Sequence, residues 1–222
     1  MLPPMTTNLR DLSSAEVYEF LCHTPNTPIK PNYLDCEKFT GFSMDYDQDI
    51  IDYECGLNKL LVVQSPNFPN AGKGLISDRP QTLTAGSSLP YWGQVFIHFY
   101  KERSIDDIPF KKEERERLVV LPFQPFLNIG IELYILGSQS SVATYSNDAK
   151  FTGWNEECKE TIHSSKKTKH IQNNCFIWCS KPADPETIGG LIAWLKSCPV
   201  WIMVKKNSKI RFGEELLTDY FD

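Results

Sequence analysis

A glycine-rich stretch near residue 72 contains the residue types of a backbone site for a small polar ligand. It reads "NAGKGLI" (Asn70–Ile76), with one glycine on each side of Lys73. Because glycine has no Cβ atom, its backbone can approach a ligand closely or adopt a positive φ. The same pattern is typical of a hairpin turn, and both interpretations stay open at this point. A phosphate-binding loop is excluded, because the stretch lacks the GxxxxGK[ST] spacing and a following helix.

A second stretch, "TYSNDAK" (Thr144–Lys150), places an amide beside a carboxylate at Asn147 and Asp148. An asparagine amide can recognise a polar ligand through its donor and acceptor atoms. Asparagine and aspartate also form ordinary turns by hydrogen bonding to nearby backbone. Taken alone, the stretch favours a turn over a ligand contact.

Five thiols and imidazoles in the second half of the chain could bind zinc by residue type. They are Cys158, His163, His170, Cys175 and Cys179. Their gaps match no standard zinc finger or knuckle, and structural zinc sites usually contain a closely spaced CxxC pair. We therefore predict no metal site. No GxSxG or comparable signature surrounds a serine or cysteine either, so nothing specific favours a hydrolase.

Two charge-dense runs are more typical of solvated surface than of a site. They are "SSKKTKH" (Ser164–His170) and "KKEERERL" (Lys111–Leu118). The alternative for the basic run is a docking patch for an acidic partner.

The charge and the cysteines limit the class of protein. The 222 residues carry a formal net charge of −5, whereas duplex-binding modules usually have a basic field. Seven cysteines, without a secretory pattern in Met1–Asn8, predict reduced thiols in a nuclear or cytoplasmic protein that is not secreted. The apolar run around Leu191–Val204 is interrupted by Lys196 and Pro199, and it is shorter than the roughly 20 residues that span a bilayer. We therefore predict a soluble protein without direct nucleic-acid or membrane contacts.

Short strands separated by turns must position these residues. The predicted strands are Leu60–Ser65, Gly72–Ser77, Tyr91–Tyr100, Ile131–Leu136 and Val200–Val204. The predicted helices are Asp11–His23, capped by Ser13 or Ser14, a helix around Lys111–Leu118, and Pro185–Lys196, in which two glycines weaken the pattern. Leu34–Tyr53 has no clear period, and Phe151–Asn174 is interpreted as a long surface excursion. The pattern predicts a β-dominated α+β domain.

The order of these fragments resembles the SET domain, the fold of protein lysine methyltransferases. The family begins with a GxG turn and a later Y-x-G, found here as Gly72-Lys73-Gly74 and Tyr91-Trp92-Gly93. "ATYSND" (Ala143–Asp148) and the pair Asn174-Cys175 are similar to its middle signature. "VWIMVKKNSKIRFGEELLTDYF" (Val200–Phe221) matches its closing signature in full. The resemblance implies a flank at 1–57 and a SET domain at 58–222, with insertions at about 101–130 and 151–190, small curved sheets and a knot-like C-terminal segment.

The resemblance also implies a reaction and a cofactor. In this family S-adenosyl-L-methionine and the target lysine enter from opposite faces, and the methyl passes from sulfonium to amine by in-line displacement. The backbone of Lys73, Gly74 and Leu75 would hold the amino-acid end of the cofactor. Asn147 and Asp148 would contact it from the other side. The partner would be a protein that presents a lysine, either a histone tail or a non-histone protein.

The resemblance assigns three aromatic residues to the reaction site. Tyr220 would be the active-site tyrosine that orients the lysine amine. Tyr134 would form an aromatic wall of the lysine channel, and Phe221 would cover the adenine ring.

The sequence departs from the family pattern in the middle signature and at the end. Asp148 stands at the position of a histidine, Thr144 at that of an arginine, and Ala149 at that of a cysteine. The cysteine-rich zinc segment that follows many members is not found after Asp222. The alternative function is therefore a catalytically inactive SET-fold interaction module.

Overall fold

The computed structural model describes residues 3–23, 31, 34, 44–68, 72–78, 83–149, 151–155, 160–163 and 171–219. Contacts between Cα atoms divide the chain into two compact units. Unit 1 comprises Met1–Met44, Trp92–Ser138 and Cys179–Val200. Unit 2 comprises Asp45–Tyr91, Gln139–Trp178 and Trp201–Asp222. Each unit combines segments of both predicted domains, and the predicted boundary between residues 57 and 58 stays a prediction.

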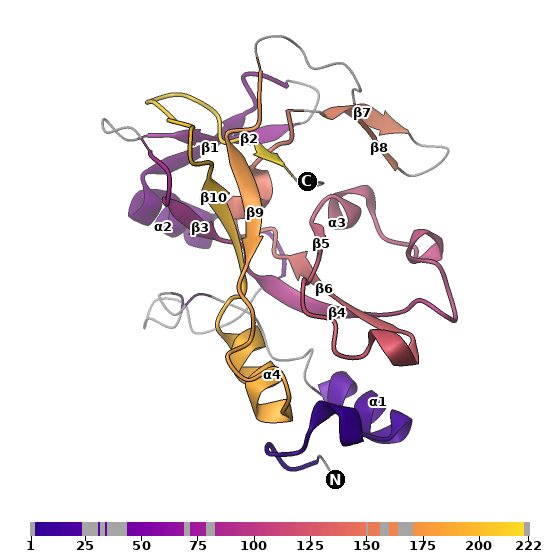
Figure 1. Ribbon diagram of the computed structural model, residues 1–222. Coiled ribbons are helices and arrows are strands. Elements are labelled where there is room, and N and C mark those ends of the chain that lie inside the picture. Colours follow the sequence, from indigo (N-terminus) through magenta and orange to yellow (C-terminus); the bar gives the residue numbers. More distant parts are fainter. Residues whose placement is uncertain are drawn as a thin grey trace. The chain divides into compact units, whose positions relative to one another are not determined.

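Unit 1 contains a three-stranded antiparallel sheet with the order β4-β6-β5 (Figure 1). The strands are β4 (Gly93–Phe99), β5 (Leu118–Val120) and β6 (Ile131–Gly137). Alternate residues of β6 are buried, among them Leu133 and Ile135, which is the period of a strand with one face in a core. The predicted strands at Tyr91–Tyr100 and Ile131–Leu136 are confirmed.

Helix α1 (Ser14–His23) begins with reciprocal hydrogen bonds between Ser13 and Glu16. The backbone N–H of Glu16 donates to Ser13 Oγ over 3.3 Å, and that of Ser13 donates to Glu16 Oε2 over 2.9 Å. This capping box satisfies two N–H groups that have no partner inside the helix. Val17 and Phe20 bury the apolar face that the sequence predicted, so the predicted helix Asp11–His23 is confirmed from Ser14 onward.

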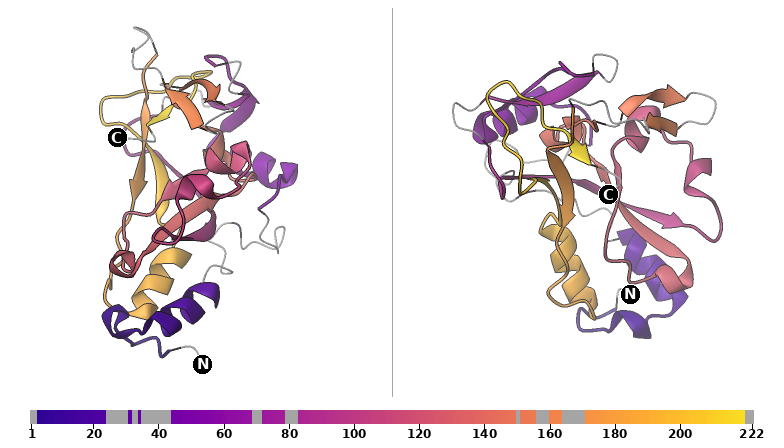
Figure 2. Two further views of the ribbon diagram at one scale, coloured as in Figure 1. Left: turned by 90° about the vertical axis from the view of Figure 1, so that its right-hand side faces the viewer. Right: turned by 45° about the horizontal axis from the view of Figure 1, so that its top comes forward.

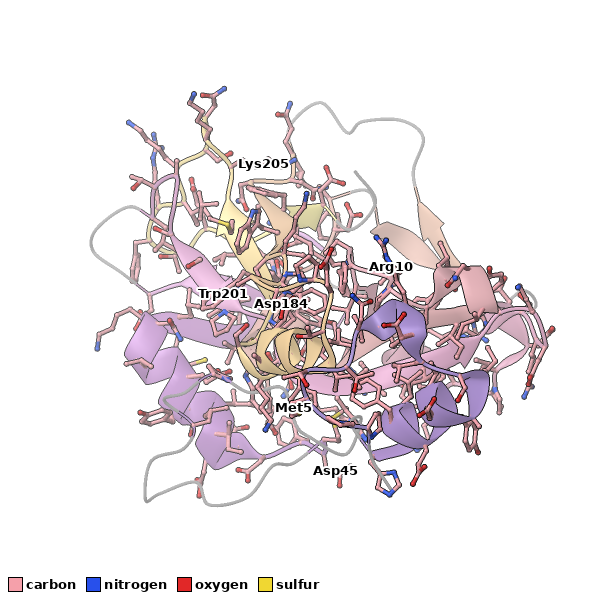
Figure 3. All side chains as sticks on the ribbon, turned by 60° about the horizontal axis from the view of Figure 1, so that its bottom comes forward. Met5, Arg10, Asp45, Asp184, Trp201 and Lys205 are labelled. Carbon is pink, nitrogen blue, oxygen red and sulfur yellow. The ribbon has the colours of Figure 1, made fainter. Side chains whose placement is uncertain are left out.

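Helix α4 (Ile188–Lys196) tolerates two glycines because other backbone lies against it. A Cβ atom at Gly190 would collide with the carbonyl oxygen of Asp184. The N–H of Gly189 donates to the carbonyl of Met5 over 2.8 Å. Figure 3 labels Met5 and Asp184 beside this helix. The glycines are therefore packing residues, and the predicted helix Pro185–Lys196 is confirmed from Ile188 onward.

The other helical segments of unit 1 whose bounds the structure describes are short. They are η1 (Leu9–Asp11), η4 (Ile105–Asp107), α3 (Lys112–Arg115) and η5 (Leu127–Ile129). The helix predicted around Lys111–Leu118 is too long, because Leu118 already starts β5.

Among the residues that the structure describes, unit 2 contains three small sheets. A four-stranded sheet has the order β11-β9-β10-β3, and β9 and β10 lie side by side in Figures 1 and 2. The pairs β1-β2 and β7-β8 form two antiparallel hairpins. The strands are β1 (Leu60–Gln64), β2 (Lys73–Ser77), β3 (Ser88–Pro90), β7 (Phe151–Asn155), β8 (Glu160–His163), β9 (Cys175–Cys179), β10 (Val200–Val204) and β11 (Thr218–Asp219). The prediction of a β-dominated fold with small sheets is confirmed.

Two elements of unit 2 differ from the sequence prediction. Helix α2 (Gln48–Asn58) occupies a stretch whose first half shows no clear period in the sequence, and its first N–H groups are capped by Asp47. Glu54, on this helix, is fully buried and accepts a 2.9 Å hydrogen bond from the N–H of Val142 at the start of η6 (Val142–Tyr145). The predicted excursion Phe151–Asn174 begins with the β7-β8 hairpin. Threading of the C-terminal segment through a loop stays a prediction.

Candidate functional site

The segment 213–219, part of the closing signature (the third motif), contacts the other two predicted motifs inside unit 2. These are the GxG turn Gly72-Lys73-Gly74 with the strand that follows it (the first motif), and Ala143–Asp148 with Asn174-Cys175 (the middle motif). The segment is bridged to β2 at Ile76 and to the middle motif at Asn147. The N–H of Leu216 donates to the carbonyl of Leu75 over 2.7 Å, and the N–H of Thr218 donates to that of Asn147 over 2.7 Å. On its β9 side, β11 runs parallel to Cys175 and Phe176. Motifs far apart in the sequence therefore meet along one short segment.

Glu215 lies at the centre of this meeting point. Its side chain is 3% exposed. Its carboxylate accepts hydrogen bonds from Ser65 Oγ at 2.8 and 3.0 Å, from Asn67 Nδ2 at 2.9 Å and N at 3.3 Å, and from Asn147 Nδ2 at 2.9 Å. Every one of these donors is uncharged. A buried carboxylate needs several such donors, because desolvation otherwise destabilises its charged form.

The amide of Asn147 joins two of the predicted motifs directly. Its Nδ2 donates to the carbonyl oxygen of Lys73 over 3.2 Å as well as to Glu215 Oε1. The structure therefore brings together Lys73 and Asn147, which the sequence predicted to hold the same ligand from two sides. Their role in holding a cofactor stays a prediction.

The first motif has an exposed and a buried part. Leu75 is fully buried, whereas the Lys73 side chain is exposed. Its Nζ lies 4.7 Å from the centroid of the Tyr46 ring and 5.8 Å from that of Tyr145, distances at which a cation is attracted to an aromatic face. Gly72 has a φ of 81°, as in the predicted turn. Sequence reasoning missed Tyr46, which lies in the predicted flank and carries no local signal.

Asp148 is hydrogen-bonded to Asn173, the residue that precedes the Asn174-Cys175 pair. Its carboxylate is almost fully buried, and Oδ1 accepts a 2.9 Å hydrogen bond from Asn173 Nδ2. Asn173 Oδ1 in turn accepts from the N–H of Ala149 over 2.7 Å. The predicted contact of Asp148 with a cofactor stays a prediction.

The side chain of Asn174 forms hydrogen bonds to the backbone of the segment 213–219. Its Oδ1 accepts from the N–H of Leu217 over 2.9 Å, and its Nδ2 donates to the carbonyl of Glu215 over 2.8 Å. The amide thus makes the pair of bonds that a neighbouring strand would supply. The sequence marked Asn174 as a motif residue without indicating this role.

Asp219 ends the described part of the closing motif. Its carboxylate is 5% exposed and lies 3.1 Å from the Nζ of Lys205, which Figure 3 labels. The predicted active-site tyrosine, Tyr220, and the predicted adenine cover, Phe221, lie outside the described residues.

Tyr134 belongs to unit 1, where it lies on β6. Its hydroxyl donates to Glu132 Oε2 over 3.0 Å. Burial, followed by the hydrogen bond and the charge of Glu132, raises the pKa of Tyr134 to about 12. The phenol is therefore neutral at physiological pH and donates rather than accepts at Glu132. Its predicted place in a lysine channel stays a prediction.

The described residues contain no group of three or more histidine, cysteine or acidic side chains that could bind a metal ion. Of the five candidate zinc ligands, Cys158 and His170 lie outside the described residues. Cys175 and Cys179 have free thiols, and burial raises their pKa values to about 12 and about 11. Among the helices that the structure describes, none is long and apolar enough to cross a membrane.

Comparison with known proteins gives matches only among solved structures. No protein-family model and no curated protein matches the sequence. The Neurospora SET domain protein DIM-5, a histone lysine methyltransferase, matches with a TM-score of 0.44 and 14% identity over 73% of this chain. The match spans 52% of the DIM-5 chain, about half its length. ATXR5, solved in complex with histone H3.1 mono-methylated on R26, matches with a TM-score of 0.40 and 18% identity over 81% of this chain and 68% of its own.

Proposed function

We propose that this protein is an S-adenosylmethionine-dependent protein-lysine N-methyltransferase. The observation that supports this most directly is the amide of Asn147, which binds the Lys73 carbonyl of the first motif and the Glu215 carboxylate of the third. The three motifs that resemble the SET family are thus physically joined, in an arrangement that their sequence separation does not require. The Lys73–Leu75 backbone and Asn147 form the two sides of the proposed cofactor site.

The residues of the first motif fit the amino-acid end of S-adenosylmethionine, which carries a carboxylate and an ammonium group. The exposed Lys73 ammonium can bind the carboxylate, and the backbone near Gly72 is accessible. A Cβ atom at Gly72 would meet no described atom within 4 Å. When bound, the cofactor supplies a sulfonium methyl group for displacement by a neutral lysine amine.

The role of the chain in this reaction is positioning and exclusion of water. Within unit 2, Lys73 and Asn147 would hold the cofactor, Phe221 would cover its adenine ring, and Tyr220 would orient the lysine amine. Oxygen dipoles aimed at the reacting centre would stabilise the positive charge of the reactants. No covalent intermediate with the protein is needed.

The proposed substrate is a lysine-bearing protein, either a histone tail or a non-histone protein, in the nucleus or the cytoplasm. The net charge of −5 is electrostatically compatible with a basic peptide. The second candidate is a SET-type interaction module without transfer activity. It is favoured by Asp148 at the position of the family's histidine, where the carboxylate is bonded to Asn173.

Calorimetry with S-adenosylhomocysteine, followed by transfer of a radioactive methyl group to histone and lysate substrates, tests the proposal. We expect binding in the micromolar range and methyl incorporation that Tyr220→Phe abolishes. If no binding is detected at millimolar S-adenosylhomocysteine, the proposal that the protein is a methyltransferase is contradicted. If a captured partner binds equally well after Tyr220→Phe, and deletion of residues 1–57 releases it, the interaction module is supported instead.

A further inference from the structure

The second glycine of the first motif is enclosed by a carboxylate. A Cβ atom on Gly74 would collide with Glu215 Oε1, and it would lie 3.0 Å from Glu215 Cδ and 3.1 Å from Ser65 Cα. Real Cβ atoms essentially never approach other atoms within 3.0 Å. Any side chain at this position must therefore displace Glu215 or separate the two strands of the β1-β2 hairpin.

The Glu215 carboxylate accepts a hydrogen bond from each of the polar groups described around it. An ionised carboxylate has acceptor oxygens only, and Ser65, Asn67 and Asn147 all offer it N–H or O–H groups. These donors come from the end of β1, the turn that follows it and the middle motif. A glutamine at this position would bring an NH₂ group against at least one of these donors.

The orientation of the Asn147 amide depends on this carboxylate. Both acceptors of Nδ2, the Lys73 carbonyl and Glu215 Oε1, require the nitrogen on the same side of the amide. If the amide rotated to accept from a glutamine, its oxygen would face the Lys73 carbonyl oxygen, and the link between the two motifs would be lost. Glu215 therefore acts on the Lys73 backbone through Asn147 and through Gly74.

We propose that Glu215 is the positioning residue of the site: its carboxylate sets the Lys73–Leu75 backbone against Asn147. Gly74 is a glycine because that carboxylate occupies the space of a side chain. The part of this inference that concerns cofactor binding rests on the proposed function. The alternative explanation of Gly74 is that the cofactor itself must approach its Cα atom, in which case the effect of a side chain is independent of Glu215.

A double-mutant cycle separates these explanations. S-adenosylhomocysteine affinity is measured by calorimetry for the wild type, Gly74→Ala, Glu215→Ala and the double variant. We expect each single change to weaken binding about tenfold or more. In the Glu215→Ala background, Gly74→Ala should add less than about twofold, because the colliding carboxylate is then removed and the 3.1 Å approach to Ser65 Cα needs only a small shift. If the loss of affinity in the double variant equals the product of the losses in the two single variants, the proposal is overturned.

Two further variants exclude a general loss of folding. Glu215→Gln keeps the size of the side chain and should still weaken binding about tenfold. Glu214→Gln, the control in the same motif, changes an exposed carboxylate that caps the N–H of Arg211, and should leave affinity within about twofold. The Michaelis constant for the cofactor should rise with Glu215→Gln while that for the peptide stays unchanged. Equal affinity of the Glu215→Gln variant and the wild type contradicts the inference.

The melting temperatures of the same four proteins, measured without cofactor, form a second double-mutant cycle. This cycle keeps the inference testable if the proposed function is wrong. Gly74→Ala should lower the melting temperature by several degrees in the wild-type background and by clearly less in Glu215→Ala. A wild type that binds no cofactor refutes the methyltransferase but leaves this coupling measurable. Additive shifts in melting temperature overturn the positioning role itself.

Discussion

Two regions of this protein, the core of unit 1 and the meeting point of the motifs in unit 2, are stabilised by different kinds of contact. In unit 1, β4 and β6 pair in continuous register from Gly93–Gly137 to Phe99–Ile131, and buried apolar and aromatic side chains form the core. In unit 2, the meeting point of the motifs is built from buried polar side chains that bond to distant backbone. Glu215 is the central one.

This difference predicts different responses to mutation. Removal of an apolar side chain in unit 1 leaves a cavity, whose cost is a loss of stability. Removal of one polar group in unit 2 leaves buried partners unsatisfied, and they must move to find new ones. Changes in unit 2 should therefore alter the geometry of the site as well as its stability.

The largest expected effect concerns the thiol of Cys175, at the start of β9 in unit 2. Burial raises its pKa to about 12, so at pH 8 its reaction with iodoacetamide should be slower than that of an ordinary thiol by a factor on the order of a thousand. Peptide mass spectrometry after timed alkylation measures this. Cys179, with a pKa of about 11, should react faster than Cys175. Equal rates for the two thiols would contradict the complete burial of Cys175.

The same raised pKa has a consequence for stability. The folded state favours the neutral thiol, so this contribution is complete below the unfolded pKa of about 8.5 and is lost as the pH rises towards about 12. Denaturant unfolding between pH 8 and pH 11 should show a decline that is smaller in Cys175→Ala.

In unit 1, Phe126→Ala should cost about 3–5 kcal/mol of unfolding free energy. Phe126 is 2% exposed and packs edge-on against Phe20 with a centroid distance of 6.4 Å. Urea unfolding followed by fluorescence measures the change. The control Val120→Ala, at a side chain that is 52% exposed, should stay within about 0.5 kcal/mol of the wild type. Similar costs for both variants would show that the apolar core does not stabilise unit 1 as described.

In unit 2, Lys205→Ala should cost about 1–3 kcal/mol, because it leaves the buried Asp219 carboxylate without its cation at 3.1 Å. The control is Lys206→Ala, at an exposed neighbour in the same turn. Because Asp219 precedes the predicted active-site tyrosine, Lys205→Ala should also weaken cofactor binding. A loss of stability without any change in affinity would separate this ion pair from the site.

The smallest expected effect is a gain. A Cβ atom at Gly56, inside helix α2, would meet no described atom within 4 Å, and the φ of this glycine is not positive. Gly56→Ala should therefore stabilise the protein by about 0.5–1 kcal/mol through helix propensity. Thermal unfolding measures the shift. A loss of stability would indicate that the helix is packed more tightly at this position than the structure describes.

The sequence alone determined the elements that depend on near neighbours. The alternation of Ile131, Leu133 and Ile135 predicts β6, because a strand places every second residue on one face. Ser13 and Glu16, three residues apart, predict the start of α1. Helix α2 shows how such a signal can be overlooked, since Asp47 is a good cap before a stretch that lacks a clear apolar period.

Only the tertiary structure decided how the motif residues contact one another. The bonds of Glu215 reach Ser65 and Asn147, 150 and 68 positions away. Sequence patterns report periodicity and capping over a few residues, whereas these bonds depend on how β2, the middle motif and the closing segment pack. The sequence thus identified Gly74 as part of a GxG motif. Only the fold showed that the Glu215 carboxylate occupies the space in which a side chain of residue 74 would lie.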